Sequence, residues 1–413
     1  MLLKFTAENV LSFKDKVNLD LTASPIKELK DTNIMKINRK QILKSAVIYG
    51  PNASGKTNLL LAIQRMWHIV LRSVQEERAT NVLPFKLDNN SENLPSLFEI
   101  AFMVEEKIYL YKFKVYKGNV VEEYLSEKAC KPRAREKMVF NRKNGEFDFD
   151  NEFKKNAEIL KDKTRANALF LSVAAQFNDT IAENIINWFK KMSFGYSVSL
   201  EKTAEKMVDE NFKSKVKTFF KNADISITNI FTVDENTNMP NVDQNPTDEN
   251  IKKKKMSIRT EHNKYDTDGN IIGATRFGLG LESEGTKKLF ELSLPIINTL
   301  EVGGVLVIDE IDCQLHPLIT KNIVKAFNAA NNKYAQLICT CHDTSLLSKE
   351  LFRRDQIWFT EKDKVEATKL YSLFECKINN GKVRNYALYE KEYLVGRYGA
   401  IPNVSNKDDD FFN

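Results

Sequence analysis

A glycine-led octapeptide near the N-terminus has the residue types of a phosphate-binding loop. Residues 50–57 read GPNASGKT, which follows the pattern G-x-x-x-x-G-K-[ST]. Gly50 and Gly55 let the backbone pass close to phosphate oxygens, and the amides that open the next helix point toward the anion. Lys56 is expected to reach the β- and γ-phosphates, and Thr57 to offer its hydroxyl to Mg²⁺. The loop therefore predicts ATP and Mg²⁺ as ligands, with these contacting residues: Gly50, Pro51, Asn52, Ala53, Ser54, Gly55, Lys56, Thr57 and Asn58.

Two adjacent acids follow an apolar run much further along the chain. Residues 303–310 read GGVLVIDE, so Asp309 and Glu310 stand at the carboxyl end of a predicted buried strand, where α/β sheets place their ligands. Asp309 is expected to hold Mg²⁺ through water, and Glu310 to polarise the attacking water as a general base. An apolar run that ends in Asp-Glu is common by itself. Here it is stronger evidence for an ATP site, because it lies downstream of a phosphate loop.

Two more residues are placed to contact a terminal phosphate. Ser283, in the segment ESEGT, lies 26 residues before Asp309 and is expected to cap a helix whose first amides bind phosphate. His342 lies 33 residues after Asp309 and follows a predicted strand, so it can donate a hydrogen bond to a γ-phosphate. An ordinary helix cap and a structural histidine are the alternatives. The ordered set of all four features favours the functional interpretation.

The elements around these residues have the periodicities of an α/β protein. Residues 45–49, SAVIY, form a short apolar run that leads directly into the phosphate loop, and apolar residues recur at helical spacing after it. Alternation at the start of the chain and over 97–125 predicts antiparallel strands. From residue 256 to 360 helices alternate with strands, the clearest at 305–308, 336–340 and 356–360, which predicts a largely parallel sheet.

The predicted fold is α/β: an antiparallel or mixed N-terminal sheet and a largely parallel sheet covered by helices, with a mainly helical insertion. Residues 150–222 read as helical, and the polar stretch 232–255 predicts an exposed or mobile loop. The expected divisions are an N-terminal ATPase lobe, the insertion, a C-terminal ATPase lobe and a tail, at 1–150, 151–260, 261–390 and 391–413.

The composition limits which class of protein this chain can belong to. The 413 residues are 42% hydrophobic, enough for a full core, and no run of 18 apolar residues predicts a membrane span. The first residues lack the features of a secretion signal, and the five cysteines are odd in number without CxxC spacing. We therefore expect a cytoplasmic protein whose thiols are reduced and mostly buried. A net charge of +6 from 62 basic and 56 acidic residues neither requires nor excludes nucleic acid as a ligand.

Three weaker signals favour structural interpretations. The DTDGN segment at 266–270 fails the EF-hand pattern, because Lys264 and Thr275 would take its first and twelfth ligand positions, and predicts a hairpin turn. Cys339, Cys341 and His342 lack the further ligands of a zinc site. The lysine run at 252–255 is read as a solvated loop, with a phosphate backbone or an acidic partner as the alternative.

As an ordered set, these motifs resemble the ABC-type ATPase heads of the SMC, RecF and OLD lineage. The resemblance rests on the phosphate loop, the SEG signature, the VLVIDE strand, a QLHP segment and His342, and covers 1–75 and about 270–360. A narrower resemblance is to the AbiL/RloA-type ATPases of phage defence, with the PARIS and Septu ATPase subunits more distant. It is carried by these stretches: LFLSVAAQFND, RFGLGLESEGTKKLFEL, VLVIDEIDCQLHP, QLICTCHDTSLLS, RDQIWFTEKD and YLVGRYGAIP.

The resemblance implies an ATP site shared between two heads. Ser283 and Gly285 would contact ATP held by Lys56 of the partner subunit. His316 stands where many ABC heads carry an aspartate in the inter-subunit loop. No glutamine fits the Q-loop well; Gln75 and Gln176 are the candidates.

The resemblance also implies partners. We expect a homodimer or higher homo-oligomer paired through ATP, controlling a separately encoded effector such as a nuclease or toxin, with a phage protein as the trigger. The 227 residues between Lys56 and Ser283 are too few for the long arms of an SMC protein. A RecF-like ATPase that repairs or binds DNA is the main alternative, and a scaffold that binds ATP and barely hydrolyses it is a third.

Overall fold

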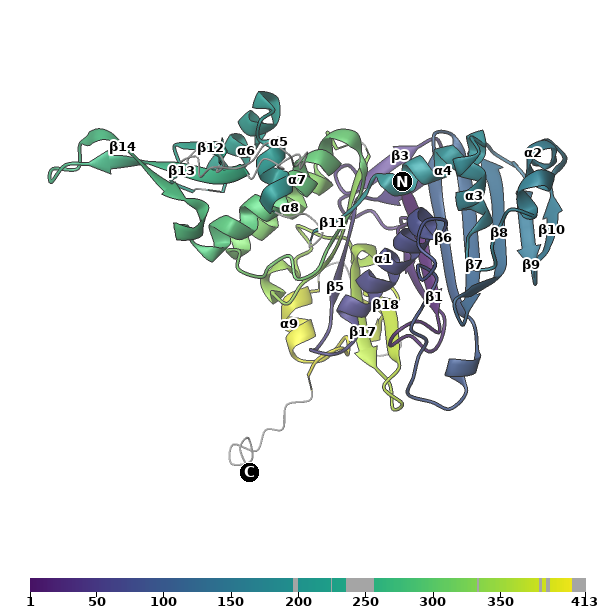
Figure 1. Cartoon of the computed structure of the whole chain (residues 1–413). Helices are drawn as coiled ribbons and strands as arrows, with labels where there is room; N and C mark the ends of the chain where they lie inside the picture. Colours follow the sequence, from purple (N-terminus) through teal and green to yellow (C-terminus); the bar gives the residue numbers. More distant parts are fainter. Residues whose placement is uncertain are drawn as a thin grey trace, which may run out of the picture.

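The computed structural model describes residues 1–195, 200–223, 225–234, 256–332, 334–378, 381–383 and 387–402. Its two large sheets stand side by side with helix α1 between them (Figure 1). A narrow hairpin projects from the end of the molecule that lies opposite the seven-stranded sheet. The α/β class predicted from the sequence is confirmed.

The first sheet is antiparallel throughout and has the strand order β10-β9-β8-β7-β6-β1-β2. Its strands are β1 Leu2–Glu8, β2 Val17–Asp20, β6 Ser96–Val104, β7 Lys107–Tyr116, β8 Asn119–Ala129, β9 Lys137–Lys143 and β10 Glu146–Phe149. The alternation expected at the start of the chain and over 97–125 is thus confirmed.

The second sheet carries the predicted ATP site and has the order β11-β15-β16-β5-β17-β18, parallel except for the last pair. Its strands are β5 Ser45–Tyr49, β11 Met192–Phe194, β15 Gly304–Ile308, β16 Ala335–Thr340, β17 Ile357–Lys362 and β18 Thr368–Ser372. β5, β15, β16 and β17 match the four runs predicted from the sequence. Strand β11 was not predicted; it lies within 151–260, so this region supplies an edge strand to the sheet that carries the phosphate loop.

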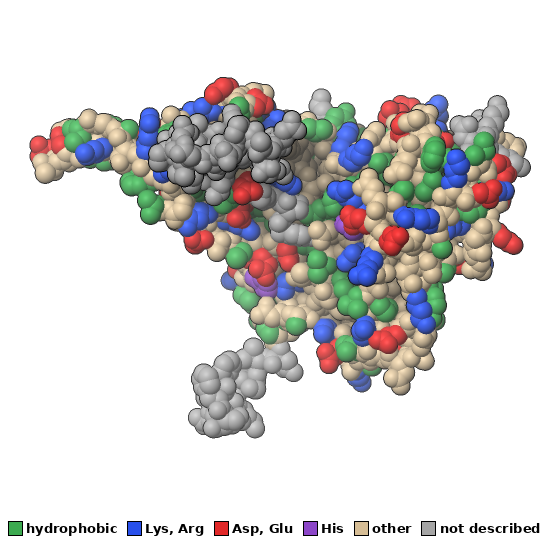
Figure 2. Space-filling view, in the orientation of Figure 1, with side chains coloured by type: hydrophobic (Ala, Val, Ile, Leu, Met, Phe, Trp, Pro, Cys, Tyr) green, Lys and Arg blue, Asp and Glu red, His purple; other side chains and the backbone are tan. Residues whose placement is uncertain are grey.

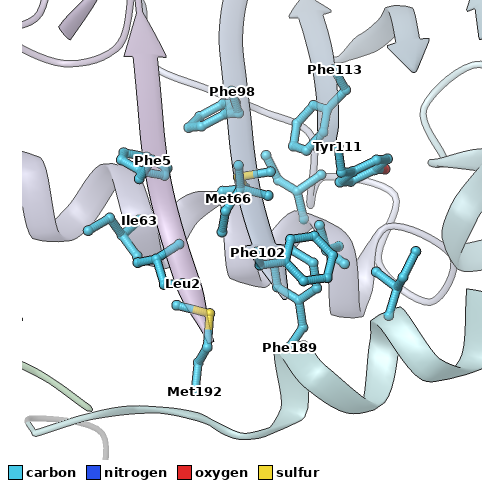
Figure 3. Packing of buried hydrophobic residues seen from close by; sticks show 14 of the residues in the cluster. Leu2, Phe5, Ile63, Met66, Phe98, Phe102, Tyr111, Phe113, Phe189 and Met192 are labelled. Atoms are coloured by element: carbon cyan, nitrogen blue, oxygen red, sulfur yellow. The ribbon is translucent and has the colours of Figure 1, made fainter. Parts of the chain in front are cut away.

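Helix α1, Lys56–Arg72, joins the two sheets through one apolar core. Ile63 and Met66 of α1 lie beside Phe5 and Phe98 of the antiparallel sheet (Figure 3). Side chains of β5 alternate between the two faces of its sheet, so Ile48 joins this core and the following residue joins a second core on the other face. The phosphate loop is therefore anchored at both ends by buried elements.

The second core packs helices against the outer face of the parallel sheet. It contains apolar residues of α6 Glu210–Lys221, α7 Glu284–Val302 and α8 Pro317–Asn328. The remaining helices are α2 Asn151–Lys161, α3 Phe170–Gln176, α4 Thr180–Lys190, α5 Leu200–Lys206 and α9 Tyr389–Leu394. The mainly helical character predicted for 150–222 is confirmed.

The projecting hairpin belongs to a small sheet of β12 Asn229–Asp234, β13 Met256–Tyr265 and β14 Ile271–Gly278. Its turn is the one predicted at 266–270: the Asp266 carboxylate accepts hydrogen bonds from the amides of Asp268 at 2.9 Å and Asn270 at 2.8 Å. The loop predicted at 232–255 begins inside β12, and residues 235–255 lie outside the described residues.

Short elements complete the fold. They are β3 Ile34–Ile37, β4 Lys40–Leu43, β19 Lys377–Ile378, β20 Gly381–Lys382 and the 3-10 turns Ser91–Asn93, Leu279–Leu281, Thr344–Leu346 and Arg354–Gln356. In the described part of the chain, no helix is long and apolar enough to span a bilayer. All five cysteines are free, and Cys313 is exposed, so the expectation of mostly buried thiols holds for Cys339 and Cys341 only.

Candidate ATP site

The phosphate loop ends in a helix N-terminus that is open to an anion. Gly55 is the N-cap of α1 with φ of 106°, a left-handed conformation that favours glycine. No side chain caps the helix and its first turn contains no acid. The positive end of the helix dipole and the first amides are thus left for a bound phosphate.

The ammonium group of Lys56 is buried inside its own loop. Its Nζ donates hydrogen bonds to the carbonyl oxygens of Gly50 at 2.8 Å and Pro51 at 3.0 Å. Burial lowers the pKa of Lys56, while the nearby carboxylates of Asp309 and Glu310 act in the opposite direction. The two acids are therefore close enough to the loop for their charges to affect the pKa of Lys56.

Hydrogen bonds from distant segments fix the loop's shape. The Thr368 hydroxyl donates to the Ser54 carbonyl oxygen at 2.9 Å and lies in hydrogen-bonding contact with the Ser12 hydroxyl at 2.8 Å. Asn58 donates to the same Ser12 hydroxyl at 2.8 Å. Asn58, predicted to contact ATP, thus holds the β1–β2 connection against α1 in this structure.

Asp309 and Glu310 lie directly after β15, where they were predicted. The Thr340 hydroxyl, at the end of neighbouring β16, donates to Asp309 Oδ1 at 2.5 Å and accepts from the Glu310 amide at 2.7 Å. Glu310 has φ of 49°, a strained conformation for this residue type. Asp309 Oδ1 faces Thr340, and the Glu310 carboxylate lies 3.8 Å from His342 Nε2.

His342 is held beside Glu310 by an acid that the sequence analysis did not single out. Asp312 Oδ2 accepts hydrogen bonds from the amides of His342 at 2.9 Å and Asp343 at 2.7 Å. The His342 Nε2 atom then lies 3.8 Å from Glu310 Oε1. The predicted base and the predicted phosphate sensor are therefore neighbours.

A cavity of about 730 Å³ opens beside Gly50 and His342. It is lined by the start of the phosphate loop, the segment around His342 and a stretch near the end of the described chain: Tyr49, Gly50, Pro51, Asn52, Cys341, His342, Thr344, Tyr393, Leu394, Ile401 and Pro402. Asn52, Ala53 and Thr57 are exposed, as ligand-binding residues of an open site would be.

The signature residues lie at the start of α7. Ser283 caps α7 as predicted, its hydroxyl accepting a hydrogen bond from the Thr286 amide at 3.1 Å. Gly285 approaches the loop after β15 so closely that an added Cβ would lie 2.8 Å from the Gln314 carbonyl oxygen. On that loop, His316 Nδ1 caps α8 by accepting from the Leu318 amide at 3.2 Å. None of these residues lines the cavity beside the phosphate loop, and neither do Lys56, Thr57, Asp309 and Glu310.

Neither Q-loop candidate is placed at the cavity. Gln75 follows the far end of α1, whose 17 residues span about 25 Å at 1.5 Å per residue. Gln176 is the exposed last residue of α3. Both assignments are therefore unsupported by the geometry.

Sequence reasoning also missed Thr340, Asp312 and the cavity wall formed by Tyr393 to Pro402. All three lie in stretches that carry the resemblance: VLVIDEIDCQLHP, QLICTCHDTSLLS and YLVGRYGAIP. Their contacts join residues 30 or more positions apart, and nothing in the local pattern indicates which residues meet.

The donor set fits a magnesium–nucleotide complex. In the described residues no cluster of three or more His, Cys, Asp or Glu side chains could hold a metal by itself. Mg²⁺ typically binds one or two protein oxygens together with water and substrate phosphates, which Asp309 and the Thr57 hydroxyl can supply. The uncapped start of α1 and the buried Lys56 fit the phosphates themselves.

The family of the chain follows from its similarity to known proteins. Residues 45–348 match the family model described as "AAA domain, putative AbiEii toxin, Type IV TA system". The match covers more than half of the chain and includes the phosphate loop, the signature, the paired acids and His342. The chain belongs to this AAA-domain family. A search of curated proteins found no match.

Among solved structures, this AAA domain is similar to SMC head domains at low identity. The SMC head domain from Thermotoga maritima shares 13% identity at a TM-score of 0.41, with 90% of this chain and 98% of that one covered. An SmcHead bound to the C-winged helix domain of ScpA shares 14% identity at 0.47, covering 90% and 97%. A head with an extended coiled coil, bound to the ScpA C-terminal domain derived from Pyrococcus furiosus, shares 12% at 0.39, covering 90% and 96%.

Proposed function

We infer that this AAA domain binds ATP with Mg²⁺ and hydrolyses it at a site completed by a second copy of the chain. One observation carries the proposal. Lys56 of the phosphate loop lies within the electrostatic influence of Glu310, and Glu310 lies 3.8 Å from His342. Ser283 and Gly285 stand at a second helix N-terminus, that of α7, where Ser283 is exposed and Gly285 meets the loop after β15. A second copy, turned to face the first, would bring the two halves together.

Each residue has a chemical role in this proposal. The amides of the loop and Lys56 bind the β- and γ-phosphates, and the Thr57 hydroxyl and Asp309 hold Mg²⁺, which neutralises charge on the phosphates. Glu310 takes a proton from the attacking water, and His342 hydrogen-bonds the γ-phosphate. Ser283 and the first amides of α7 contact the same phosphate from the partner subunit.

The biological role that we propose is an ATP-controlled switch in phage defence of the abortive-infection or toxin–antitoxin type. Pairing with ATP would hold or release a separately encoded effector, such as a nuclease, and a phage component would act as the trigger. The family description and the resemblance to AbiL/RloA-type ATPases support this. The proposed setting is the cytoplasm.

The test is Mg²⁺-dependent ATP hydrolysis by the purified chain, alone and with the product of the neighbouring gene. Glu310→Gln keeps the shape of the side chain and removes the base, so it should bind ATP, stop turnover and accumulate the paired state. Wild-type turnover by Glu310→Gln would remove this residue from its role, and absence of hydrolysis under both conditions would remove the catalytic proposal.

The DNA-binding alternative predicts a different surface and a different experimental result. Basic and acidic side chains are interspersed over the described residues on the face in Figure 2, without a broad basic surface there. A DNA-stimulated ATPase whose DNA affinity falls steeply with salt would nevertheless favour the RecF-like role.

A further inference from the structure

The projecting hairpin leads directly into the signature. Strand β14 ends at Gly278 and α7 begins at Glu284, so residues 279–283 are the whole connection between them. Within the hairpin, β13 pairs with β14 from one end of β14 to the other. The outer part of the hairpin projects away from the rest of the molecule (Figure 1). Its inner end therefore lies next to the helix start that carries Ser283.

Glu282, the residue before Ser283, is held by side chains of β13. The Thr260 hydroxyl donates a hydrogen bond to Glu282 Oε1, and His262 Nε2 lies 2.9 Å from the same oxygen. Thr260 is fully buried, and the Glu282 side chain is only 12% exposed. We call these two contacts the Glu282 clamp. Because both partners lie on β13, the clamp ties the hairpin to the residue that precedes the signature serine.

Packing holds only the first part of the connection between the hairpin and α7. Leu279 joins the second core, as does Ile258 at the inner end of β13. Gly280, by contrast, is exposed, and Leu281 is 78% exposed. A cavity of about 300 Å³ lies beside residues 278–280, between them and the start of α5. The connection therefore has room to move after Leu279, and the Glu282 clamp fixes its last residue before the signature serine.

The position of Ser283 depends on the residue before it. Its hydroxyl accepts a hydrogen bond from the Thr286 amide at 3.1 Å and lies 2.9 Å from the Thr286 hydroxyl, so the serine is oriented with the first turn of α7. Ser283 itself is exposed, and its backbone is extended, with φ of −62° and ψ of 154°. A shift of Glu282 would therefore move the Ser283 hydroxyl and loosen the first turn together.

We propose that Glu282 is a positioning residue for the signature, through which the hairpin controls ATP hydrolysis. The clamp fixes Ser283 and the first amides of α7 where they contact the nucleotide, and a displacement of β13 changes that contact. The proposal rests on the divided ATP site proposed above and adds a point of control to it. Because Lys56 and its loop take no part in the clamp, its loss lowers turnover and leaves ATP binding by the isolated chain intact.

The first experiment tests the clamp without ATP, by hydrogen exchange of the amides at 282–288 in the full chain. Glu282→Ala removes the acceptor, so exchange there should become about tenfold faster, as for a locally opened helix end. Glu282→Gln keeps an oxygen that can accept from both partners and should stay within about twofold of wild type. Arg276→Gln breaks an ion pair with Glu261 on the same hairpin and is the matched control. Unchanged exchange in Glu282→Ala would overturn the clamp, whatever the ATPase result.

The second experiment measures turnover and ATP binding separately. Glu282→Ala should lower kcat by about tenfold or more, the scale expected when a contacting group is misplaced. Its affinity for ATP as an isolated chain should stay within about twofold of wild type, and Arg276→Gln should change neither quantity. Combined with Ser283→Ala, the loss should be smaller than the product of the two single losses, because Glu282 acts through the serine and its helix start. Losses that multiply would overturn the positioning role.

The two experiments separate failure of this proposal from failure of the proposed function. If the wild-type chain hydrolyses ATP and Glu282→Ala does so at the same rate, the control by Glu282 fails and the divided site stands. If the wild-type chain does not hydrolyse ATP, alone or with the product of the neighbouring gene, the catalytic proposal fails and the control of hydrolysis fails with it.

Discussion

The Thr340 side chain, at the end of β16, contacts Asp309, which follows the neighbouring parallel strand β15. Its hydroxyl donates to Asp309 Oδ1 at 2.5 Å and accepts from the Glu310 amide at 2.7 Å. One hydroxyl on β16 therefore orients both acids at the end of β15. The direction of the predicted Mg²⁺ ligand depends on a residue that would not contact the metal.

Thr340→Val keeps the shape of this side chain and removes both hydrogen bonds. We expect turnover to fall about 10- to 100-fold, the usual cost of losing a group that orients a metal ligand. The Mg²⁺ concentration for half-maximal activity should rise as well, which steady-state rates at varied Mg²⁺ will measure. Thr340→Ser retains the hydroxyl and should stay close to wild type; equal losses in both variants would point to packing instead.

Asp312 should act through His342. Asp312→Ala removes the acceptor for the amides of His342 and Asp343, so the histidine loses its position and turnover should fall about 10-fold or more. The double variant with His342→Ala should be no slower than His342→Ala alone, as coupling through one residue requires. Cys313→Ala, at the exposed next position, serves as the control. Additive losses would assign Asp312 a role independent of His342.

Binding of ATP should change the protonation of Lys56. Burial lowers the pKa of this ammonium in the unliganded chain, and a bound phosphate would raise it again because an opposite charge favours the charged form. At pH values between the two pKa values, binding takes up a proton, so ATP affinity should fall as the pH rises through that range. Calorimetry at alkaline pH in buffers of different ionisation enthalpy will measure the uptake. Heats that do not depend on the buffer would contradict it.

Glu123 should contribute strongly to the stability of the antiparallel lobe. Fully buried, it accepts hydrogen bonds from the amides of Phe170 at 2.7 Å and Leu171 at 2.9 Å and from the Tyr111 hydroxyl at 2.8 Å, with Arg142 3.6 Å away.

Both carboxylate oxygens of Glu123 face donors, so an amide in its place would turn an NH₂ group toward an N–H or O–H. Glu123→Gln should lower the free energy of unfolding by about 3 kcal/mol, in the range for breaking a buried charge network. Chemical denaturation measures this loss. Glu122→Gln, which breaks a half-exposed pair with Lys114, should cost less than about 1 kcal/mol. Similar losses in the two variants would refute the assigned role.

The parts of the site that could be predicted from the sequence are those that depend on residues close together in the chain. The phosphate loop depends on local glycines and a strand–helix context, and Asp309 and Glu310 depend on the apolar run before them. Ser283 was predicted as a helix cap from the residues around it in the sequence, and it is the N-cap of α7 in the structure.

The remainder depends on contacts between distant segments. Thr340 meets Asp309 across 31 positions, and β11 joins β15 although more than 100 residues separate them. Tyr393, near the end of the described chain, contacts Tyr49 of β5 and Phe359 of the neighbouring strand β17. Periodicity describes which face of an element is buried, and it does not state which other element covers that face. These pairings therefore appeared only in the folded chain.

The central claim, an ATP site divided between two copies, is tested most directly by mixing two variants that are inactive in complementary ways. Lys56→Ala loses ATP at its own loop and keeps its signature, whereas Ser283→Arg binds ATP and blocks the contact with its partner's nucleotide. Each alone should hydrolyse ATP at a few per cent of the wild-type rate or less. Mixed in equal amounts, half of the dimers would carry one intact site, so about a quarter of wild-type activity should return. Wild-type turnover by Ser283→Arg alone, or no recovery at any mixing ratio, would contradict a divided site.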